Sequence, residues 1–183
     1  MPVSKQTIRE IAARGGISRV SQESVDLLNG IADRVLSLTF PKDASVVLQN
    51  VLARVTVLAE QNELISSVLD QTVRSASQEI FPVPHDTARR LIRVHAGDVK
   101  VPENTIRTIS HMIGHLLEQL ILPANRLIPA GLDRKLEGKH IVQLIATLES
   151  LNLPPIGPLD KVNRKSKSRK SKSKKSLRRR SRK

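Results

Sequence analysis

The sequence predicts an all-α body made of two similar units, followed by a basic C-terminal tail. Leu, Ile and Val recur three and four residues apart through most of residues 1–153, and no stretch alternates apolar and polar residues for long enough to indicate a strand. A weak internal repeat, with a period of about 80 residues, divides this body into two parts. Residues 154–183 are rich in Lys, Arg and Ser and have no apolar face to bury, so we expect them to form a disordered tail.

The repeat sets the boundaries of the units. Residues 7–11 (TIREI) align with residues 87–91 (TARRL), and the glycine pair at 15–16 aligns with Ala-Gly at 96–97. Each unit therefore has a short basic helix, a glycine break, a loop, a long helix and a final helix. The predicted organisation is a first unit at 1–78, a proline-stiffened linker at 79–85, a second unit at 86–153 and the tail at 154–183.

Apolar spacing places a short, a long and a short helix in each unit. The expected helices are 5–14, 22–50 and 57–75 in the first unit, and 86–95, 103–128 and 139–151 in the second. Pro41 and Pro123 fall inside the two long helices, where a proline costs about 3 kcal/mol or forces a kink. Each long helix therefore either bends at its proline or is two helices, and the sequence leaves both alternatives open.

The excess positive charge lies at one end of the chain. The formal net charge is +14, and residues 161–183 contain 14 basic residues and no acidic one, which leaves the rest of the chain neutral. A segment this basic is typical of proteins that bind polyanions. The chain has two Phe, no Tyr and no Trp, so it offers few rings on which single-stranded bases could stack. Contact with double-stranded DNA through its phosphates is therefore favoured.

Several classes of function find no support in the sequence. The absence of cysteine excludes disulfides and thiolate ligands, and no apolar run is long enough to span a bilayer. His111 and His115 have the spacing of two zinc ligands on a helix, but only Glu118 lies near them as a third, so two packed histidines are the favoured interpretation. No phosphate-binding loop or nucleophile motif is present. We predict no enzyme activity, no metal, no cofactor, no small-molecule substrate and no membrane partner.

The local sequence resembles a known family. Residues 8–21 (IREIAARGGISRVS) resemble the first helix and loop of core histone four over about fourteen positions, and residues 54–57 (RVTV) are similar to the second-loop pattern Arg-x-Thr-Val of histones. Residues 89–93 and 139–144 look like a more diverged histone. The chain thus resembles a histone-fold doublet, similar to the fused histones of large DNA viruses.

That resemblance implies two tandem histone folds paired as an intrachain handshake, with the first loop of each unit beside the second loop of the other. It implies sequence-independent contacts to DNA phosphates, the mode for which the histone octamer is the standard example. It also implies other histones or histone doublets as partners, and a location in the nucleus, a viral particle or a viral factory. The expected DNA-binding residues are Arg9, Arg14, Arg19 and Arg54 in the first unit, Arg89, Arg90, Arg93, Lys100, Arg134, Lys135 and Lys139 in the second, and Arg164, Lys165, Arg169, Lys170, Arg178, Arg179 and Arg180 in the tail.

Other interpretations stay open. The chain could be a histone-fold scaffold subunit of a transcription or chromatin complex whose basic tail only anchors it, or an unrelated helical protein with a basic tail. Arg19 and Arg54 could be ordinary solvated loop residues. The arginines at 89, 90 and 93 could form a charged helix face that pairs with Asp86, and the tail could be a nuclear-import signal or a solubilising segment.

Overall fold

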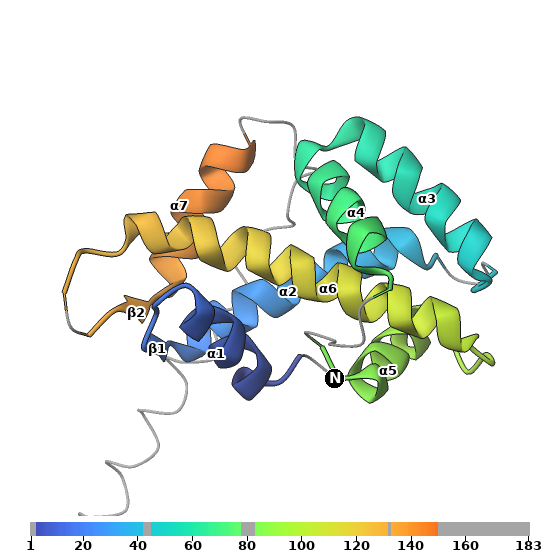
Figure 1. Ribbon diagram of the computed structural model, residues 1–183, viewed down its shortest axis with the longest axis horizontal. Coiled ribbons are helices and arrows are strands. Elements are labelled where there is room, and N and C mark those ends of the chain that lie inside the picture. Colours follow the sequence, from blue (N-terminus) through green and yellow to red (C-terminus); the bar gives the residue numbers. More distant parts are fainter. Residues whose placement is uncertain (1–2, 42–44, 78–82, 132, 150–183) are drawn as a thin grey trace, which may run out of the picture. The chain divides into compact units, whose positions relative to one another are not determined.

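The computed structural model describes residues 3–41, 45–77, 83–131 and 133–149, and Figure 1 shows their arrangement. These residues form seven α-helices, one short 3-10 helix and two two-residue strands. In chain order the elements are α1 (Lys5–Arg14), β1 (Arg19–Val20), α2 (Gln22–Thr39), α3 (Leu48–Gln61), α4 (Glu63–Ser75), α5 (His85–Ala96), α6 (Glu103–Ala124), η1 (Asn125–Leu127), β2 (Lys135–Leu136) and α7 (Gly138–Glu149). The all-α prediction is confirmed for this part of the chain, while the predicted tail, residues 154–183, lies outside the described residues.

The expected long helix of the first unit is divided at Pro41, because the chain leaves helical geometry just before this proline. Helix α2 ends at Thr39, and the backbone of Phe40 leaves helical geometry with φ −122° and ψ 68°. A proline disfavours helical geometry in the residue before it and lacks the N–H that would continue the helix. The phenyl ring of Phe40 is buried and anchors the chain at this break. Of the two alternatives left open at Pro41, the structure therefore has two separate helices.

The remaining boundary of the first unit also differs from the prediction. Helix α3 runs through residues 51–56, where a loop was expected, and the break comes later, at Asn62. The side-chain Oδ1 of Asn62 accepts a hydrogen bond of 3.1 Å from the N–H of Ile65 and so caps α4. The expected helix at 57–75 is therefore divided between the end of α3 and α4.

The short helices follow the predictions closely. Helix α1 has the predicted bounds, and the Ser4 hydroxyl caps it by accepting a hydrogen bond of 3.1 Å from the N–H of Thr7. Helices α5 and α7 begin within one residue of their predicted starts. In the second unit Pro123 lies in the last turn of α6, and the α-helix stops one residue later and tightens into η1. Because Pro123 stands at the end of α6, the long helix is continuous up to that proline.

Helix α6 forms the centre of the core. It packs against α1, α2, α3, α4, α5 and α7, and Figure 1 shows it running through the middle of the helical body. A helix that is surrounded by others must be apolar on most of its circumference. Its fully buried large side chains include Ile106, Ile109, Ile113, Leu116, Leu117, Leu120 and Ile121.

Helices α2 and α6 contact each other and run in opposite directions (Figure 1). Strand β1, which precedes α2, pairs in parallel with β2, which follows α6. At the other end, Thr105 in the first turn of α6 donates a hydrogen bond of 2.9 Å from its hydroxyl to the carbonyl of Val46, beyond the end of α2. The described residues of the two predicted units therefore meet at both ends of this helix pair and belong to one compact unit.

Candidate nucleic-acid interface

The β1/β2 ladder brings cations from the two halves of the chain together. Arg19 lies opposite Lys135, and Val20 lies opposite Leu136. The N–H groups of Ser18 and Arg19 donate to the carbonyl of Arg134 at 2.9 and 3.1 Å. Such backbone bonds fix where the neighbouring side chains leave the chain, and so they hold Arg19 beside Lys135. No strand was predicted here, because two residues are too few for an alternating pattern to be recognised.

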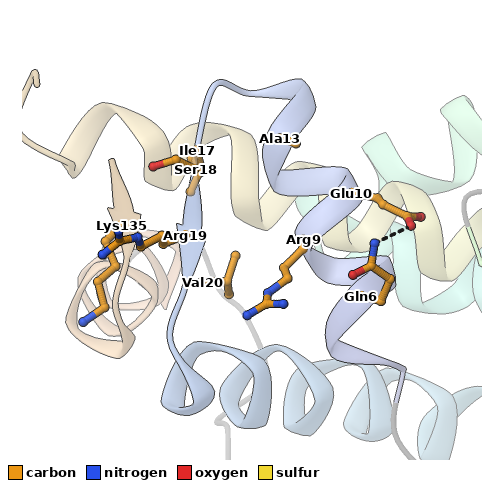
Figure 2. Close-up of a pocket in the computed structure, with 9 residues that line it drawn as sticks. All are labelled: Gln6, Arg9, Glu10, Ala13, Ile17, Ser18, Arg19, Val20 and Lys135. Atoms are coloured by element: carbon orange, nitrogen blue, oxygen red, sulfur yellow. Dashed lines mark hydrogen bonds between the residues drawn. The ribbon is translucent and has the colours of Figure 1, made fainter. Parts of the chain in front are cut away.

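A pocket of about 460 Å³ lies beside this ladder and is lined by three cationic side chains. Figure 2 shows Arg19 of β1 beside Lys135 of β2, and Arg9 projecting from α1 on the other side of β1. Arg9 is exposed and makes no hydrogen bond or ion pair with any described residue. Lys139, in the first turn of α7, lies close by because it shares a carboxylate with Lys135. We call Arg9, Arg19, Lys135 and Lys139 the β1/β2 ridge.

Two carboxylates neutralise most of the β1/β2 ridge. The guanidinium of Arg19 lies 3.0 Å from Oδ2 of Asp133. The two oxygens of Glu137 bind separate lysines, Oε1 at 3.2 Å from Nζ of Lys135 and Oε2 at 2.8 Å from Nζ of Lys139. Hydrogen bonds from Lys139 and then Lys135 hold the pKa of Glu137 below its usual value. Asp133 and Glu137 were not among the predicted site residues, although Glu137 stands between Lys135 and Lys139 in the sequence.

Arg134 belongs to the same loop but is directed inward. Its Nη2 donates to the carbonyl of Asn125 at 2.9 Å, and its Nε is buried with no hydrogen-bond partner among the described residues. The side-chain amide of Asn125 in turn donates to the carbonyl of Gly15. Arg134 therefore helps to position the loop that precedes β2. Its role as a phosphate contact stays a prediction.

Arg54 also has a structural position. It was expected in a loop, but it lies in the middle of α3. Its Nε donates to the carbonyl of Thr39 at 2.7 Å, and its Nη2 donates to the carbonyl of Ser45 at 2.5 Å. Thr39 is the last residue of α2, where carbonyl groups have no partner within the helix. The guanidinium thus ties the end of α2 to the start of the next segment, and the prediction of Arg54 as a loop residue is wrong.

The cations of α5 are engaged with acidic or backbone groups. Arg89 lies 3.3 Å from Asp86 and 3.2 Å from Glu103, and Arg93 lies 3.9 Å from Asp98. The Nε of Arg90 donates to the backbone carbonyl of Asp86 at 3.1 Å. One of the alternatives left open was that these arginines form a charged helix face that pairs with Asp86. The structure shows this pairing for Arg89. Lys100, in the loop before α6, is exposed and has no ion pair among the described residues.

Arg14 is part of a half-buried polar network between helices. Its Nη1 lies 2.9 Å from Oε1 of Glu118, and Oε2 of Glu118 lies 3.2 Å from Nδ1 of His115. The Nε2 of His115 and the hydroxyl of Ser75 are hydrogen-bonded at 2.8 Å, which joins α4 to α6. The rings of His115 and His111 stack with centroids 6.1 Å apart. The predicted packed histidines are thus seen, and among the described residues no three potential ligands gather around a common point.

The predicted tail residues at positions 164, 165, 169, 170, 178, 179 and 180 lie outside the described part of the chain. Within the described part, no helix has the length and apolarity that crossing a membrane requires. The geometry therefore brings together cations from four elements, α1, β1, β2 and α7, in the β1/β2 ridge, beside an open pocket. Compared with known proteins, the chain matches no protein-family model, no curated protein and no solved structure.

Proposed function

We propose that this chain is a histone-fold doublet that packages double-stranded DNA by sequence-independent contacts to phosphates. The observation that carries the proposal is the β1/β2 ladder. It joins the first loop of one half to the second loop of the other, beside two antiparallel long helices. This is the relationship that an intrachain handshake of two histone folds requires.

The packing between the halves supports the same proposal. A single three-helix unit leaves one face of its long helix bare, so it must pair with another unit to bury that face. Here α1 packs on α6, and α2 packs on both α5 and α7. Each half thus completes the core of the other, and two units on one polypeptide serve as a ready-made pair.

The charge distribution suggests different roles in DNA binding for the body and for the tail. The body is neutral, and residues 161–183 hold the whole net charge of +14. Phosphate contacts from a folded ridge fix position and orientation on the duplex, while a dense run of cations supplies salt-dependent affinity. We therefore assign positioning to the β1/β2 ridge and most of the affinity to the tail. Other histones or histone doublets complete the particle, in a nucleus, a viral particle or a viral factory.

A scaffold subunit of a transcription or chromatin complex is the second candidate. It is favoured by the ion pairs that Arg14, Arg19, Arg89, Arg93, Lys135 and Lys139 make with carboxylates of the same chain. Cations that are already paired have less to offer to phosphates. In this alternative, protein contacts dominate and the tail serves as an anchor.

Nuclease protection separates the two candidates. We expect the full chain, mixed with partner histones and double-stranded DNA, to protect a discrete length of DNA from digestion. Salt-sensitive binding without a discrete protected length would contradict packaging and support the scaffold.

A matched pair of variants tests the role of the β1/β2 ridge in this assay. Arg9→Ala removes a ridge arginine that has no ion pair among the described residues. Arg74→Ala removes an exposed arginine of α4 that likewise has no ion pair among them. Only Arg9→Ala should reduce protection, and it should lower the slope of log affinity against log salt by about 0.9. Equal effects of the two variants would exclude the ridge as the DNA contact.

A further inference from the structure

We propose that Asp133 and Glu137 are built-in competitors of DNA phosphate, which hold the β1/β2 ridge in a self-neutralised state and so limit its affinity for DNA. This inference rests on the proposed function and adds its regulation. It assigns to two acidic residues the control of a site that is otherwise built from cations.

The geometry places the carboxylates where phosphate oxygens would bind. Glu137 uses both oxygens, one on Lys135 at 3.2 Å and the other on Lys139 at 2.8 Å. Oδ2 of Asp133 lies 3.0 Å from Nη1 of Arg19. A carboxylate and a phosphate present similar pairs of anionic oxygens to Lys and Arg. Of the four ridge cations, three therefore already have an anionic partner, and among them Arg9 alone has none within the described part of the chain.

These ion pairs are weak enough to be displaced. The side chains of Arg19 and Asp133 are 69% and 58% exposed, so water and salt screen their interaction. Exposed ion pairs contribute little to stability because their attraction is offset by solvation and lost side-chain freedom. A duplex that approaches the ridge can therefore exchange each carboxylate for a phosphate, and the remaining cost of that exchange lowers the net affinity.

The competition also changes how binding responds to salt. Each phosphate that a protein neutralises adds about 0.9 to the magnitude of the slope of log affinity against log salt. When a lysine leaves a carboxylate to bind a phosphate, the freed carboxylate attracts a cation from solution. Fewer counterions are therefore released in total than when an unpaired lysine binds the phosphate. The wild-type ridge should therefore give a shallower salt dependence than its number of cations implies. The lowered pKa of Glu137 keeps its carboxylate ionised in mildly acidic solution, so the competition persists there.

The test replaces the carboxylates in the full chain by their neutral amides. Glu137→Gln and Asp133→Asn each keep the size and backbone of the side chain and remove its charge. Glu60→Gln is the matched control, because Glu60 is an exposed residue of α3 and the change in net charge is the same. Helix α3 lies away from β1 and β2 (Figure 1). Binding to a short double-stranded DNA is measured by fluorescence anisotropy over a series of salt concentrations, and thermal unfolding verifies that each variant is folded.

We expect Glu137→Gln and Asp133→Asn to bind about threefold more tightly at low salt, the effect of removing one exposed ion pair of ordinary strength. The salt slope should steepen by about 0.9 for each variant, because each removes one negative charge that competes with phosphate. The control should match the wild type in both measurements.

The contrary outcomes separate this inference from the proposed function. If the wild type binds DNA and the two amide variants bind no more tightly, the competition does not exist and the proposed function stands. If Glu60→Gln gives the same gain, the effect comes from net charge alone and the assignment to Asp133 and Glu137 is wrong. If neither the wild type nor any variant binds DNA, the proposed function fails and takes this inference with it.

Discussion

The Nδ1 atom of His115 lies 3.2 Å from Oε2 of Glu118, one turn further along the central helix α6. The other oxygen of this carboxylate lies 2.9 Å from the guanidinium of Arg14 on α1, and the far nitrogen of His115 is hydrogen-bonded to Ser75 on α4. Glu118 is thus the centre of a network that ties two helices of the first half to the long helix of the second. Because its side chain is only 20% exposed, the network is less screened by water than the surface ion pairs are.

Glu118→Gln should lower the free energy of unfolding at neutral pH, and this loss should shrink in acid. The hydrogen bond from His115 is the largest cause that holds the pKa of Glu118 below its ordinary value of 4.5, and Arg14 adds to it. A carboxyl whose pKa is lower in the folded state stabilises the protein above its unfolded-state pKa and loses that contribution as the pH falls through the folded-state value. The variant should therefore be less stable than the wild type above about pH 4.5, and the difference should shrink at lower pH. Urea unfolding at several pH values measures this, and a difference that is constant with pH would contradict it.

Arg54→Met should destabilise the fold without weakening DNA binding by the folded protein. Methionine keeps an apolar stem but leaves the carbonyls of Thr39 and Ser45 without their donor. The expected loss of unfolding free energy is about 1–3 kcal/mol, the usual cost of removing the partner of a partly buried polar group. Chemical denaturation measures it, and Arg74→Met, at an exposed position of α4, is the control. Unchanged stability together with weaker DNA binding would instead make Arg54 a phosphate contact.

Deletion of residues 161–183 should lower DNA affinity and flatten its salt dependence. This segment contains 14 cations and no acidic residue, whereas the remaining chain is neutral. Because each neutralised phosphate contributes about 0.9 to the salt slope, the tail should supply most of that slope. Anisotropy titrations of the full and truncated chains over a salt series measure the difference. An unchanged slope would remove the tail from DNA binding and leave the β1/β2 ridge as the main contact.

Helical structure in this chain was predictable wherever local signals agree. Helix α1 has a serine cap before it and a double glycine after it, and its predicted bounds are confirmed. At Pro41 the local signals conflict, since the apolar periodicity continues past a residue that breaks helices. Residues 54–57 were placed in a loop because they are similar to the second-loop pattern of histones. The structure has helix α3 there, with Val51 and Val55 buried one turn apart.

The candidate site was only partly predictable. Arg9, Arg19, Lys135 and Lys139 were expected among the DNA contacts, and they do gather at the β1/β2 ridge. Nothing in the sequence separated them from Arg134, which stands next to Lys135 but is directed inward. Neighbours in an extended segment leave the chain on opposite sides, so which one faces the solvent depends on what packs against the segment.

The sequence by itself determined that the body is helical and that the excess positive charge resides in residues 161–183, because periodicity and charge are properties of short stretches of chain. Only the tertiary structure decided which cations are available to a ligand. Arg19 meets Asp133 and Arg14 meets Glu118 only after the two halves have packed against each other. Electrostatic neutralisation acts over a few ångströms of space, whatever the separation in sequence, so it is set by the fold.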